Sequence, residues 1–324
     1  MTTLLGGLDI GGTKCAAVLG RASEDGIEIV AKRSFPTPAS PQEALEALGA
    51  VLAELADEHH ASGLQAIGIS CGGPLDSGAG LILSPPNLPG WDRIDVVTPF
   101  KERFGVPVGL QNDANACALA EWKWGAGRGS RNMIFLTFGT GMGAGLILDG
   151  RLYAGTNDMA GEVGHMRLEQ DGPEGYGKSG SFEGFCSGGG IAKLARSRAL
   201  EWLAEGKSTL LCSKTGEVDG ITAKLVGEAA RAGDELALDV MGNVGRQLGR
   251  GLAVLVDVLN PERIVIGSIY ARQQALLDPG MLAELQAEAL SLSLKACRIV
   301  PAGLGETVGD AASLSVAQYA LARE

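Results

Sequence analysis

The stretch Leu8-Asp9-Ile10-Gly11-Gly12-Thr13-Lys14 (LDIGGTK) decides how the start of the chain folds. Apolar residues on both sides of its glycines predict two strands, over residues 4–10 and 14–19, joined by a tight turn. Because glycine has no Cβ, such a turn can approach a phosphate closely and point its N–H groups at the anion. Asp9 is an unusual neighbour for a phosphate unless Mg²⁺ lies between them. The donors of this candidate phosphate site are Gly11, Gly12, Thr13 and Lys14.

A second strand–turn–strand pattern follows over residues 133–148, where MIFLTF leads through GTGMG into AGLIL. Asp149-Gly150 then signals a hairpin turn. The recurrence predicts a duplicated α/β architecture. Either glycine turn alone is more often an ordinary turn, and neither matches a P-loop. Together they predict a nucleotide held in a cleft between two halves, with Gly139, Thr140 and Gly141 as the second set of donors.

Other segments supply the elements around these turns. Ser40-Pro41-Gln42-Glu43 has the residues of a helix start, and leucines 45, 48, 52 and 55 follow at helical spacing. Asn112-Asp113 is predicted to open another helix, and an alanine-rich helix follows residues 309–313. Further strands are predicted over residues 26–33, 66–70, 106–110 and 263–267.

Composition narrows the possible functions. The 324 residues suggest about two domains, and the net charge of −11 argues against a nucleic-acid partner. No apolar run is long enough to span a membrane, and no signal sequence opens the chain, so a cytoplasmic protein without a membrane partner is predicted. The six cysteines show neither metal-ligand nor disulfide-scaffold spacing.

Several motifs along nearly the whole chain together resemble the ROK family of repressors, open reading frames and sugar kinases. They are LDIGGTK, PPNLPGW, QNDANACALAEWKWGAG, FLTFGTGMGAGLILDGRLYAG, AGEVGHM and NPERIVIG. The resemblance implies the α/β, actin-like ATPase (ribonuclease H-like) duplicated fold, with two domains and a central cleft. The smaller domain is expected over residues 1–112 plus 310–324 and the larger over 113–309. A homodimer is also expected, since dimers are common in the family.

The resemblance implies an ATP-dependent sugar kinase that phosphorylates a hydroxyl of a hexose or N-acetylated hexosamine. Asp113 matches the catalytic base, although the Asn-Asp pair alone would more often be a helix cap. ATP and Mg²⁺ are the implied cofactors, with Mg²⁺ held by Asp9 through water. The implied substrate-binding residues are Gly72, Gly73, Asn87, Asn112, Asp113, Glu162, His165 and Glu183. The implied nucleotide-binding residues are Asp9, Gly11, Gly12, Thr13, Lys14, Gly139, Thr140, Gly141, Gly267 and Ser268.

The sequence departs from the family in one loop. Most members bind zinc with a histidine and the three cysteines of C-x-C-G-x-x-G-C-x-E, and the corresponding positions here hold Glu174, Tyr176 and Ser181. No zinc site is therefore expected. His165 then needs another anchor, and we expect a hydrogen bond between its imidazole and Glu174, Tyr176 or a backbone carbonyl.

Two alternatives to a kinase stay open. ROK repressors bind sugar through the same fold but carry an N-terminal winged helix-turn-helix, which this acidic sequence lacks. A sugar-binding protein without activity is the other alternative, and the presence of Asp9, Asp113 and both glycine turns argues against it. The pocket residues do not separate glucose from N-acetylglucosamine or N-acetylmannosamine.

Overall fold

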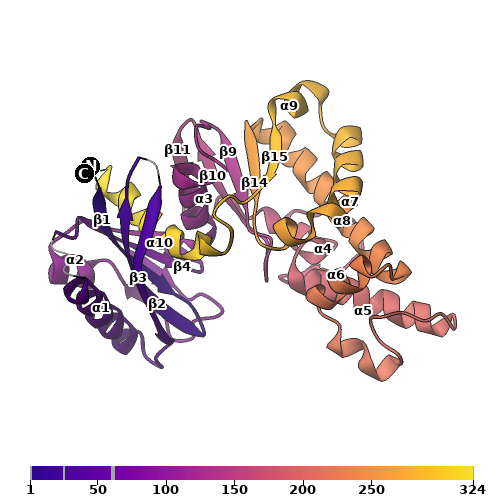
Figure 1. The fold of residues 1–324 in the computed structure, drawn as a ribbon, viewed down its shortest axis with the longest axis horizontal. Coiled ribbons are helices and arrows are strands. Elements are labelled where there is room, and N and C mark those ends of the chain that lie inside the picture. Colours follow the sequence, from indigo (N-terminus) through magenta and orange to yellow (C-terminus); the bar gives the residue numbers. More distant parts are fainter. Residues whose placement is uncertain (1, 25, 60–62, 324) are drawn as a thin grey trace. The chain divides into compact units, whose positions relative to one another are not determined.

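The computed structural model describes residues 2–24, 26–59 and 63–323, which form two compact units (Figure 1). The first unit comprises Met1–Arg131, Gly145–Ala160 and Gly303–Glu324. The second comprises Asn132–Ala144 and Gly161–Ala302. The domain boundaries expected from the family, at residues 112 and 310, stay a prediction.

A five-stranded sheet organises the first unit, in the order β3-β2-β1-β4-β8. β1 pairs antiparallel with β2, as LDIGGTK predicts, and parallel with β4. The predicted third strand runs three residues longer, and the strand predicted at residues 106–110 begins two residues later. The strands are β1 (Thr3–Ile10), β2 (Lys14–Ala22), β3 (Ile27–Pro36), β4 (Ala66–Cys71) and β8 (Val108–Asn112).

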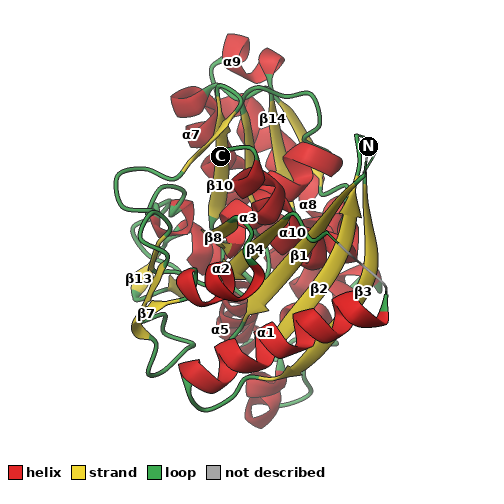
Figure 2. Ribbon diagram, turned by 90° about the vertical axis from the view of Figure 1, so that its left-hand side faces the viewer, coloured by secondary structure: helices red, strands yellow, loops and turns green. Residues whose placement is uncertain are grey.

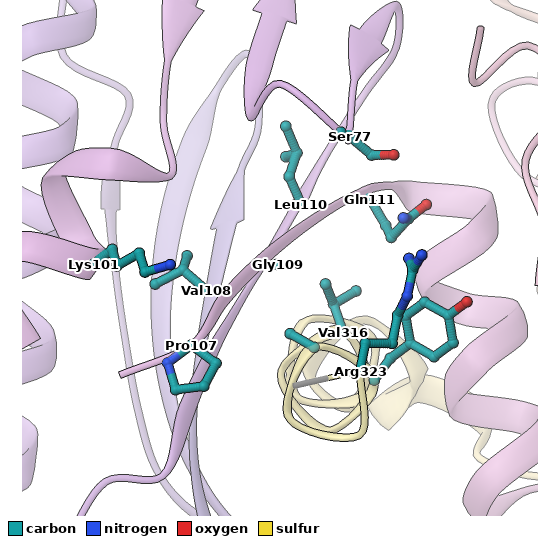
Figure 3. Close-up of a pocket in the computed structure, with 12 residues that line it drawn as sticks. Ser77, Lys101, Pro107, Val108, Gly109, Leu110, Gln111, Val316 and Arg323 are labelled. Atoms are coloured by element: carbon teal, nitrogen blue, oxygen red, sulfur yellow. The ribbon is translucent and has the colours of Figure 1, made fainter. Parts of the chain in front are cut away.

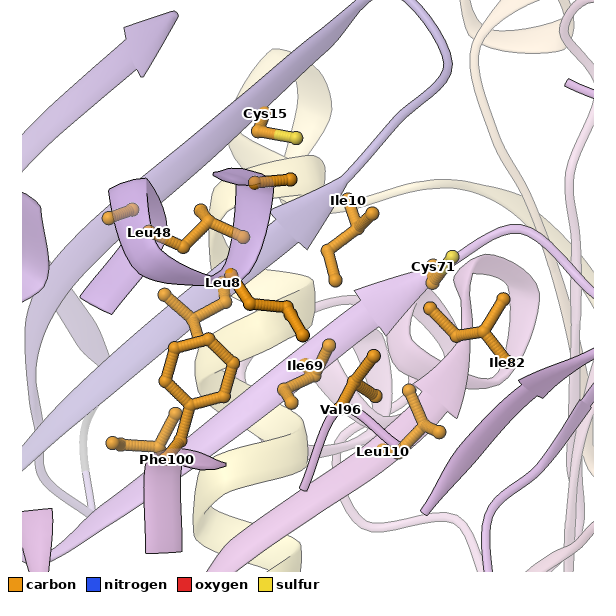
Figure 4. Close-up of a cluster of buried hydrophobic side chains, with 14 of the residues drawn as sticks. Leu8, Ile10, Cys15, Leu48, Ile69, Cys71, Ile82, Val96, Phe100 and Leu110 are labelled. Atoms are coloured by element: carbon orange, nitrogen blue, oxygen red, sulfur yellow. The ribbon is translucent and has the colours of Figure 1, made fainter. Parts of the chain in front are cut away.

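One face of this sheet is covered by α1 (Pro41–Glu58), as Figure 2 shows. The predicted helix start is confirmed, since the Ser40 side chain accepts a hydrogen bond from the Glu43 amide at 3.2 Å. The predicted leucine stripe is buried against alternate residues of the strands, including Leu8 and Ile10 (Figure 4). Alternate strand residues share one face of a sheet, so this apolar set forms a single core.

The opposite face is covered by α10 (Val308–Leu321), which packs on β1, β4 and β8. Glycines in the strands allow the close approach. A Cβ on Gly68 would lie 2.0 Å from the Ser313 carbonyl oxygen, and one on Gly7 would lie 2.2 Å from the Ser313 hydroxyl. Asp9 alternates with Leu8 and Ile10 along β1, so it belongs to this second face.

The remaining elements of the first unit include a small antiparallel sheet and the β10–β11 hairpin. Asp149 and Gly150 form the predicted hairpin turn, with φ of 57° and 74°. These elements are β5 (Leu75–Asp76), β6 (Leu81–Leu83), β7 (Asp92–Asp95), α2 (Thr98–Phe104), α3 (Asp113–Trp124), β10 (Ala144–Leu148), β11 (Arg151–Tyr153) and the 3₁₀ turn Gly305–Thr307.

In the second unit, β9 (Met133–Leu136), β14 (Arg263–Ile266) and β15 (Arg298–Pro301) run parallel, with β14 between the other two. This trio repeats the parallel trio β1, β4 and β8 of the first unit, as the duplicated fold requires. No helix in the described residues is long and apolar enough to span a membrane.

Helices account for most of the second unit, together with the small hairpin β12 (Glu174–Gly175) and β13 (Lys178–Ser179). The α-helices are α4 (Phe182–Phe185), α5 (Gly188–Ala204), α6 (Ala223–Arg231), α7 (Glu235–Leu259), α8 (Ile269–Glu288) and α9 (Ser291–Ala296). The 3₁₀ turns are η1 (Val163–His165) and η2 (Thr215–Gly220).

Candidate functional site

The first turn, residues 11–13 between β1 and β2, is held by its own backbone and by one threonine. The Gly11 amide donates to the Lys14 carbonyl at 3.2 Å. Thr37 donates its hydroxyl to the Gly11 carbonyl at 2.5 Å and its amide to the Thr13 carbonyl at 3.1 Å. Among the described residues, the amides of Gly12 and Thr13 donate to no protein group. Two backbone donors are therefore available to an anion.

Asn87 packs against this turn. A Cβ on Gly12 would lie 2.3 Å from the Asn87 carbonyl oxygen, so no larger residue fits there without movement. A Cβ on Gly72 would lie 3.6 Å from the Asn87 side-chain oxygen, an ordinary contact, and one on Gly73 would meet nothing within 4 Å. The structure thus brings Asn87 and Gly72, two of the predicted sugar residues, to the first turn.

Two carboxylates, Asp9 on β1 and Asp113 at the start of α3, influence one another electrostatically. Burial raises the pKa of Asp9 to about 6, the negative charge of Asp113 adds to the rise, and Lys32 and Lys14 lower it. Desolvation also raises the pKa of Asp113, and the Ala114 amide opposes this by donating to its Oδ1 at 2.8 Å. Two mutually repelling carboxylates supply the hard oxygen ligands that suit Mg²⁺.

Asn112 and Asp113 prove to be a helix cap as well as candidate site residues. The Asn112 side-chain oxygen accepts from the Asn115 amide at 2.8 Å, which makes Asn112 the N-cap of α3. Asp113 is then the first helical residue, where the helix dipole favours a negative charge. Capping leaves the side-chain nitrogen of Asn112 as its remaining group for a ligand.

The second turn, residues 139–143 in the loop after β9, is held differently. Thr137 and Gly143 form three hydrogen bonds. The Gly143 carbonyl accepts from the Thr137 amide at 3.0 Å and from its hydroxyl at 3.3 Å, and the Gly143 amide donates to that hydroxyl at 2.8 Å. The Gly139 amide donates to the Gly141 carbonyl at 3.2 Å. In the described part of the chain, the amides of Thr140 and Gly141 have no protein acceptor. This turn also offers two free donors.

A pocket of about 1020 Å³ opens beside the second turn. The N-termini of α5, α6 and α8 line it, and the positive end of each helix dipole favours an anion. Three of the predicted nucleotide residues line it directly: Gly139, Thr140 and Ser268. Gly267 precedes Ser268, and Gly141 lies on the side of the turn that faces Glu183. The other lining residues are Gly188, Gly189, Thr222, Ala223, Lys224, Glu228, Arg231, Ile269, Arg272 and Gln273.

Sequence reasoning missed most of that lining. Gly188 and Gly189 belong to a Ser-Gly-Gly-Gly stretch, in which the Ser187 hydroxyl accepts from the Gly190 amide at 3.0 Å and caps α5. Serine followed by glycines at a helix start was the available signal for an anion site. Arg231 and Arg272 reach the pocket from two different helices, and no local pattern marks them.

Glu183 on α4 is a predicted sugar residue that contacts the second turn. Its carboxylate accepts from the Met142 amide at 3.0 Å, and a Cβ on Gly141 would lie 2.9 Å from the same oxygen. Glu162 and His165 are exposed at the two ends of η1, and the His165 amide donates to the Glu162 carbonyl at 3.1 Å. A Cβ on Gly164 would lie 3.2 Å from the Glu183 Cβ, so η1 packs against Glu183 at Gly164.

The loop between η1 and α4 contains a β-hairpin where the family's zinc loop was expected to differ. Glu174 pairs with Ser179, while Tyr176 and Gly177 form the turn with φ of 44° and 73°. The expected side-chain brace of His165 is wrong, because neither Glu174 nor Tyr176 bonds its imidazole among the described residues. No group of three or more His, Cys, Asp or Glu side chains there is arranged to hold a metal ion.

A separate hollow of about 400 Å³ lies along β8, the edge strand of the first sheet (Figure 3). Lys101 and Arg323 extend into it, and Gln111 lines it. Gln111 is tied to α3 by a 3.1 Å hydrogen bond from the Asn115 side chain. The hollow is lined by none of the predicted site residues.

Comparison with known proteins places these features in a family. The profile described as "ROK family" matches residues 5–318. A curated glucokinase of Streptomyces coelicolor is 34% identical over 275 residues, covering 84% of each chain. An N-acetylmannosamine kinase of Escherichia coli O1:K1 is 34% identical over 270 residues, covering 82% of each chain.

Solved structures agree with the sequence relatives. A ROK family glucokinase from Streptomyces griseus, in complex with glucose and AMPPNP, has a TM-score of 0.75 at 32% identity. The match covers 98% of this chain and 99% of that one. A ROK family transcriptional regulator, homologous to the E. coli MLC protein, shares the fold with a TM-score of 0.84 at 23% identity. That match covers 98% of this chain and 78% of the regulator.

Proposed function

Because the chain belongs to the ROK family, we propose that it is an ATP-dependent sugar kinase. The proposed acceptor is a hydroxyl of a hexose or of an N-acetylated hexosamine. The glucokinase and the N-acetylmannosamine kinase named above are both 34% identical to this chain, so they support the enzyme class without separating the substrates.

One observation supports the proposal most directly. The negative charges of Asp9 and Asp113 together favour a bound cation. Asp113 adds to the rise of the Asp9 pKa to about 6. Lys32 and Lys14 offset part of this negative charge. A bound cation would offset more of it, and the adjacent first turn offers two unpaired amides for phosphate.

In the proposed reaction the sugar hydroxyl attacks the γ-phosphorus of ATP. A new O–P bond forms, the bond to the β-phosphate oxygen breaks, and ADP leaves. Asp113 accepts the hydroxyl proton, and its raised pKa makes it a better base than an ordinary aspartate. Amides of the two turns hold the phosphates, so most of the catalysis is alignment and charge neutralisation.

The proposed sugar-binding residues are Asn112, Glu162, His165 and Glu183, with Gly72, Gly73 and Asn87 lining the pocket. The proposed nucleotide site comprises the first turn with Lys14, the second turn, Gly267 and Ser268. The 1020 Å³ pocket beside the second turn supports placing the nucleoside there. Bound Mg²⁺, held by Asp9 through water, would neutralise charge on the phosphates.

We also propose that the protein is a cytoplasmic homodimer. An apolar surface on α7 and α9 supports the dimer: Val258 is 73% exposed, Leu290 65% and Leu292 81%. The two helices are joined there, since the Leu290 amide donates to the Asp257 carboxylate at 3.0 Å. Val258→Asp with Leu292→Asp should give monomers by sedimentation, whereas Leu210→Asp, an exposed leucine elsewhere, should not. Monomeric wild-type protein would contradict this assignment.

A sugar-sensing regulator is the second candidate, because a ROK regulator shares the fold across 98% of this chain. An assay of ADP release over a panel of hexoses and N-acetylhexosamines distinguishes the two. A kinase should turn over at least one sugar, and Asp113→Asn should lower kcat about 10³-fold, as expected for loss of a general base. Sugar binding without turnover on any sugar would favour the regulator or a non-catalytic binding protein.

A further inference from the structure

Three cationic side chains in the second unit donate to backbone carbonyls around the β12–β13 hairpin. Lys178 donates to the His165 carbonyl at 2.7 Å. Lys193, on α5, donates to the Glu174 carbonyl at 2.8 Å. Arg167 donates to the Ser179 carbonyl at 2.8 Å and to the Gln170 carbonyl at 3.3 Å. These bonds join the hairpin to η1, to α5 and to Arg167, which lies between η1 and the hairpin.

The hairpin has a short backbone ladder of its own and is anchored at its base. The Gly180 amide donates to the Pro173 carbonyl at 3.1 Å, and the Leu168 amide to the Gly180 carbonyl at 2.9 Å. The Phe182 amide donates to the Met166 carbonyl at 2.8 Å, and the Phe182 side chain is fully buried. The base of the hairpin is therefore fixed, while its tip carries the 78% exposed Tyr176.

The hairpin also supports α4 from behind. A Cβ on Gly175 would lie 2.6 Å from the Gly184 amide and 2.9 Å from the Glu183 Cβ, so these backbones are in direct contact. The Ser181 hydroxyl accepts from the Gly184 amide at 3.1 Å and caps α4. Glu183 is thus positioned by the hairpin, and His165 is joined to the same hairpin by Lys178.

We propose that Lys178 is a positioning residue for substrate binding, which fixes the backbone of His165 relative to Glu183. The argument rests on the proposed function for its substrate, a polyhydroxylated sugar. Lys178 is half-buried, and its ammonium ion is the only side-chain donor bonded to the His165 carbonyl within the described residues. One charge-assisted hydrogen bond therefore holds the His165 backbone to the hairpin that packs against Glu183.

Lys178→Met removes the donor and keeps the length of the side chain, and Lys178→Arg restores a cation. In the kinase assay, Lys178→Met should raise the KM for the sugar about tenfold, as for loss of one charge-assisted hydrogen bond. The KM for ATP and the melting temperature should stay within error, and Lys178→Arg should recover most of the sugar affinity. Lys214→Met, the same change at an exposed lysine outside the hairpin, is the control.

A second measurement needs no enzymatic activity. The chain has three histidines, so ¹H–¹³C spectra of the imidazoles are readily assigned with a His165→Gln variant. Lys178→Met should shift or broaden the His165 signal and leave the other two unchanged. An unchanged His165 signal with an unchanged sugar KM would overturn the proposal. If the wild-type protein phosphorylates no sugar, the proposed function fails and the His165 signal alone decides the role of Lys178.

Discussion

The two glycine turns offer the same number of free amides but are attached to the protein by different means. The first, besides its hydrogen bonds from Thr37, is packed against the Asn87 carbonyl, which leaves no room for a Cβ on Gly12. The second is held electrostatically, by the bond from the Met142 amide to the Glu183 carboxylate. Each turn therefore contacts one of the predicted sugar residues. A shift of either turn should therefore weaken binding of the proposed sugar as well as of the proposed phosphates.

The residue two positions before each turn differs in charge. Asp9 precedes Gly11, and Thr137 precedes Gly139. The Thr137 hydroxyl is used within its own turn, where it accepts from the Gly143 amide. Asp9 instead has a carboxylate with a pKa raised to about 6. The strand that leads into the turn thus carries a carboxylate at the first turn and a neutral hydroxyl at the second, where the carboxylate comes from Glu183 on α4.

Of the changes that compare the two turns, the addition of one methyl group to each should have the largest effect. Gly12→Ala would place its Cβ 2.3 Å from the Asn87 carbonyl oxygen, whereas the Cβ of Gly139→Ala would meet nothing within 4 Å. We expect Gly12→Ala to lower kcat/KM about 100-fold, near 2.7 kcal/mol, and to lower the melting temperature. Gly139→Ala should keep its melting temperature and raise only the KM for ATP, because residue 139 lines the pocket.

Steady-state kinetics and thermal unfolding of both variants test this contrast. Equal losses of stability in the two variants would show that the first turn is not closed by Asn87. Equal tolerance would show that Asn87 moves aside easily. The control is a change at Asn87 itself. Asn87→Ala is preferred because it keeps the carbonyl in place, whereas Asn87→Gly would also free the loop backbone.

Local sequence patterns predicted the turns well because their physical causes are local. Glycines between apolar runs predicted both turns, and the Ser40-Pro41 start and leucine stripe predicted α1. The strand predicted at residues 106–110 was placed two residues early, because the apolar run starts before the ladder with β4. Ladder partners are set by tertiary pairing, which a single segment does not encode.

The candidate site was less predictable because its supports come from distant segments. Asn112 and Asp113 could be identified from their own dipeptide and the family resemblance. The Lys178 bond to the His165 carbonyl could not, because a lysine in a glycine-rich loop is typical of a solvated surface. The pocket cations Arg231 and Arg272 lie on helices whose packing, rather than sequence, brings them together.

The next largest effect concerns the charge of Asp9. Its pKa is raised from 3.8 to about 6, so the charged form of Asp9 is less favourable in the folded state than in the unfolded state. The resulting loss of stability is absent below pH 4, grows between pH 4 and 6, and reaches its full size above pH 6. Asp9→Asn should therefore raise the free energy of unfolding at pH 8 by about 2 kcal/mol, less than the roughly 3 kcal/mol of the full shift because the side chain is only half-buried, and hardly at all near pH 4. Urea unfolding at both pH values measures this, with Thr137→Val at the matching position as a pH-independent control.

A smaller effect is expected at Glu183. Glu183→Gln keeps an oxygen for the Met142 amide but removes the negative charge that strengthens the bond. We expect about a tenfold rise in the KM for the sugar and a smaller rise in the KM for ATP, since the carboxylate contacts both the turn and the proposed sugar site. A change confined to the sugar would mean that the second turn does not depend on its carboxylate anchor. Kinetics with each substrate varied in turn separate these outcomes.

The smallest effect concerns Ser268, which lines the pocket of the second turn with φ 46° and ψ −98°. No residue of the first turn has a positive φ, so this strain belongs to the second turn's pocket alone. Ser268→Gly should raise the free energy of unfolding by about 1 kcal/mol, because glycine adopts such angles freely. Ser268→Ala keeps the strain and loses only the 2.9 Å bond from Arg272, so it should not be stabilised. If both variants unfold at the same urea concentration, the backbone there is not strained; if only the glycine variant gains, the serine is retained for its hold on Arg272 at the cost of stability.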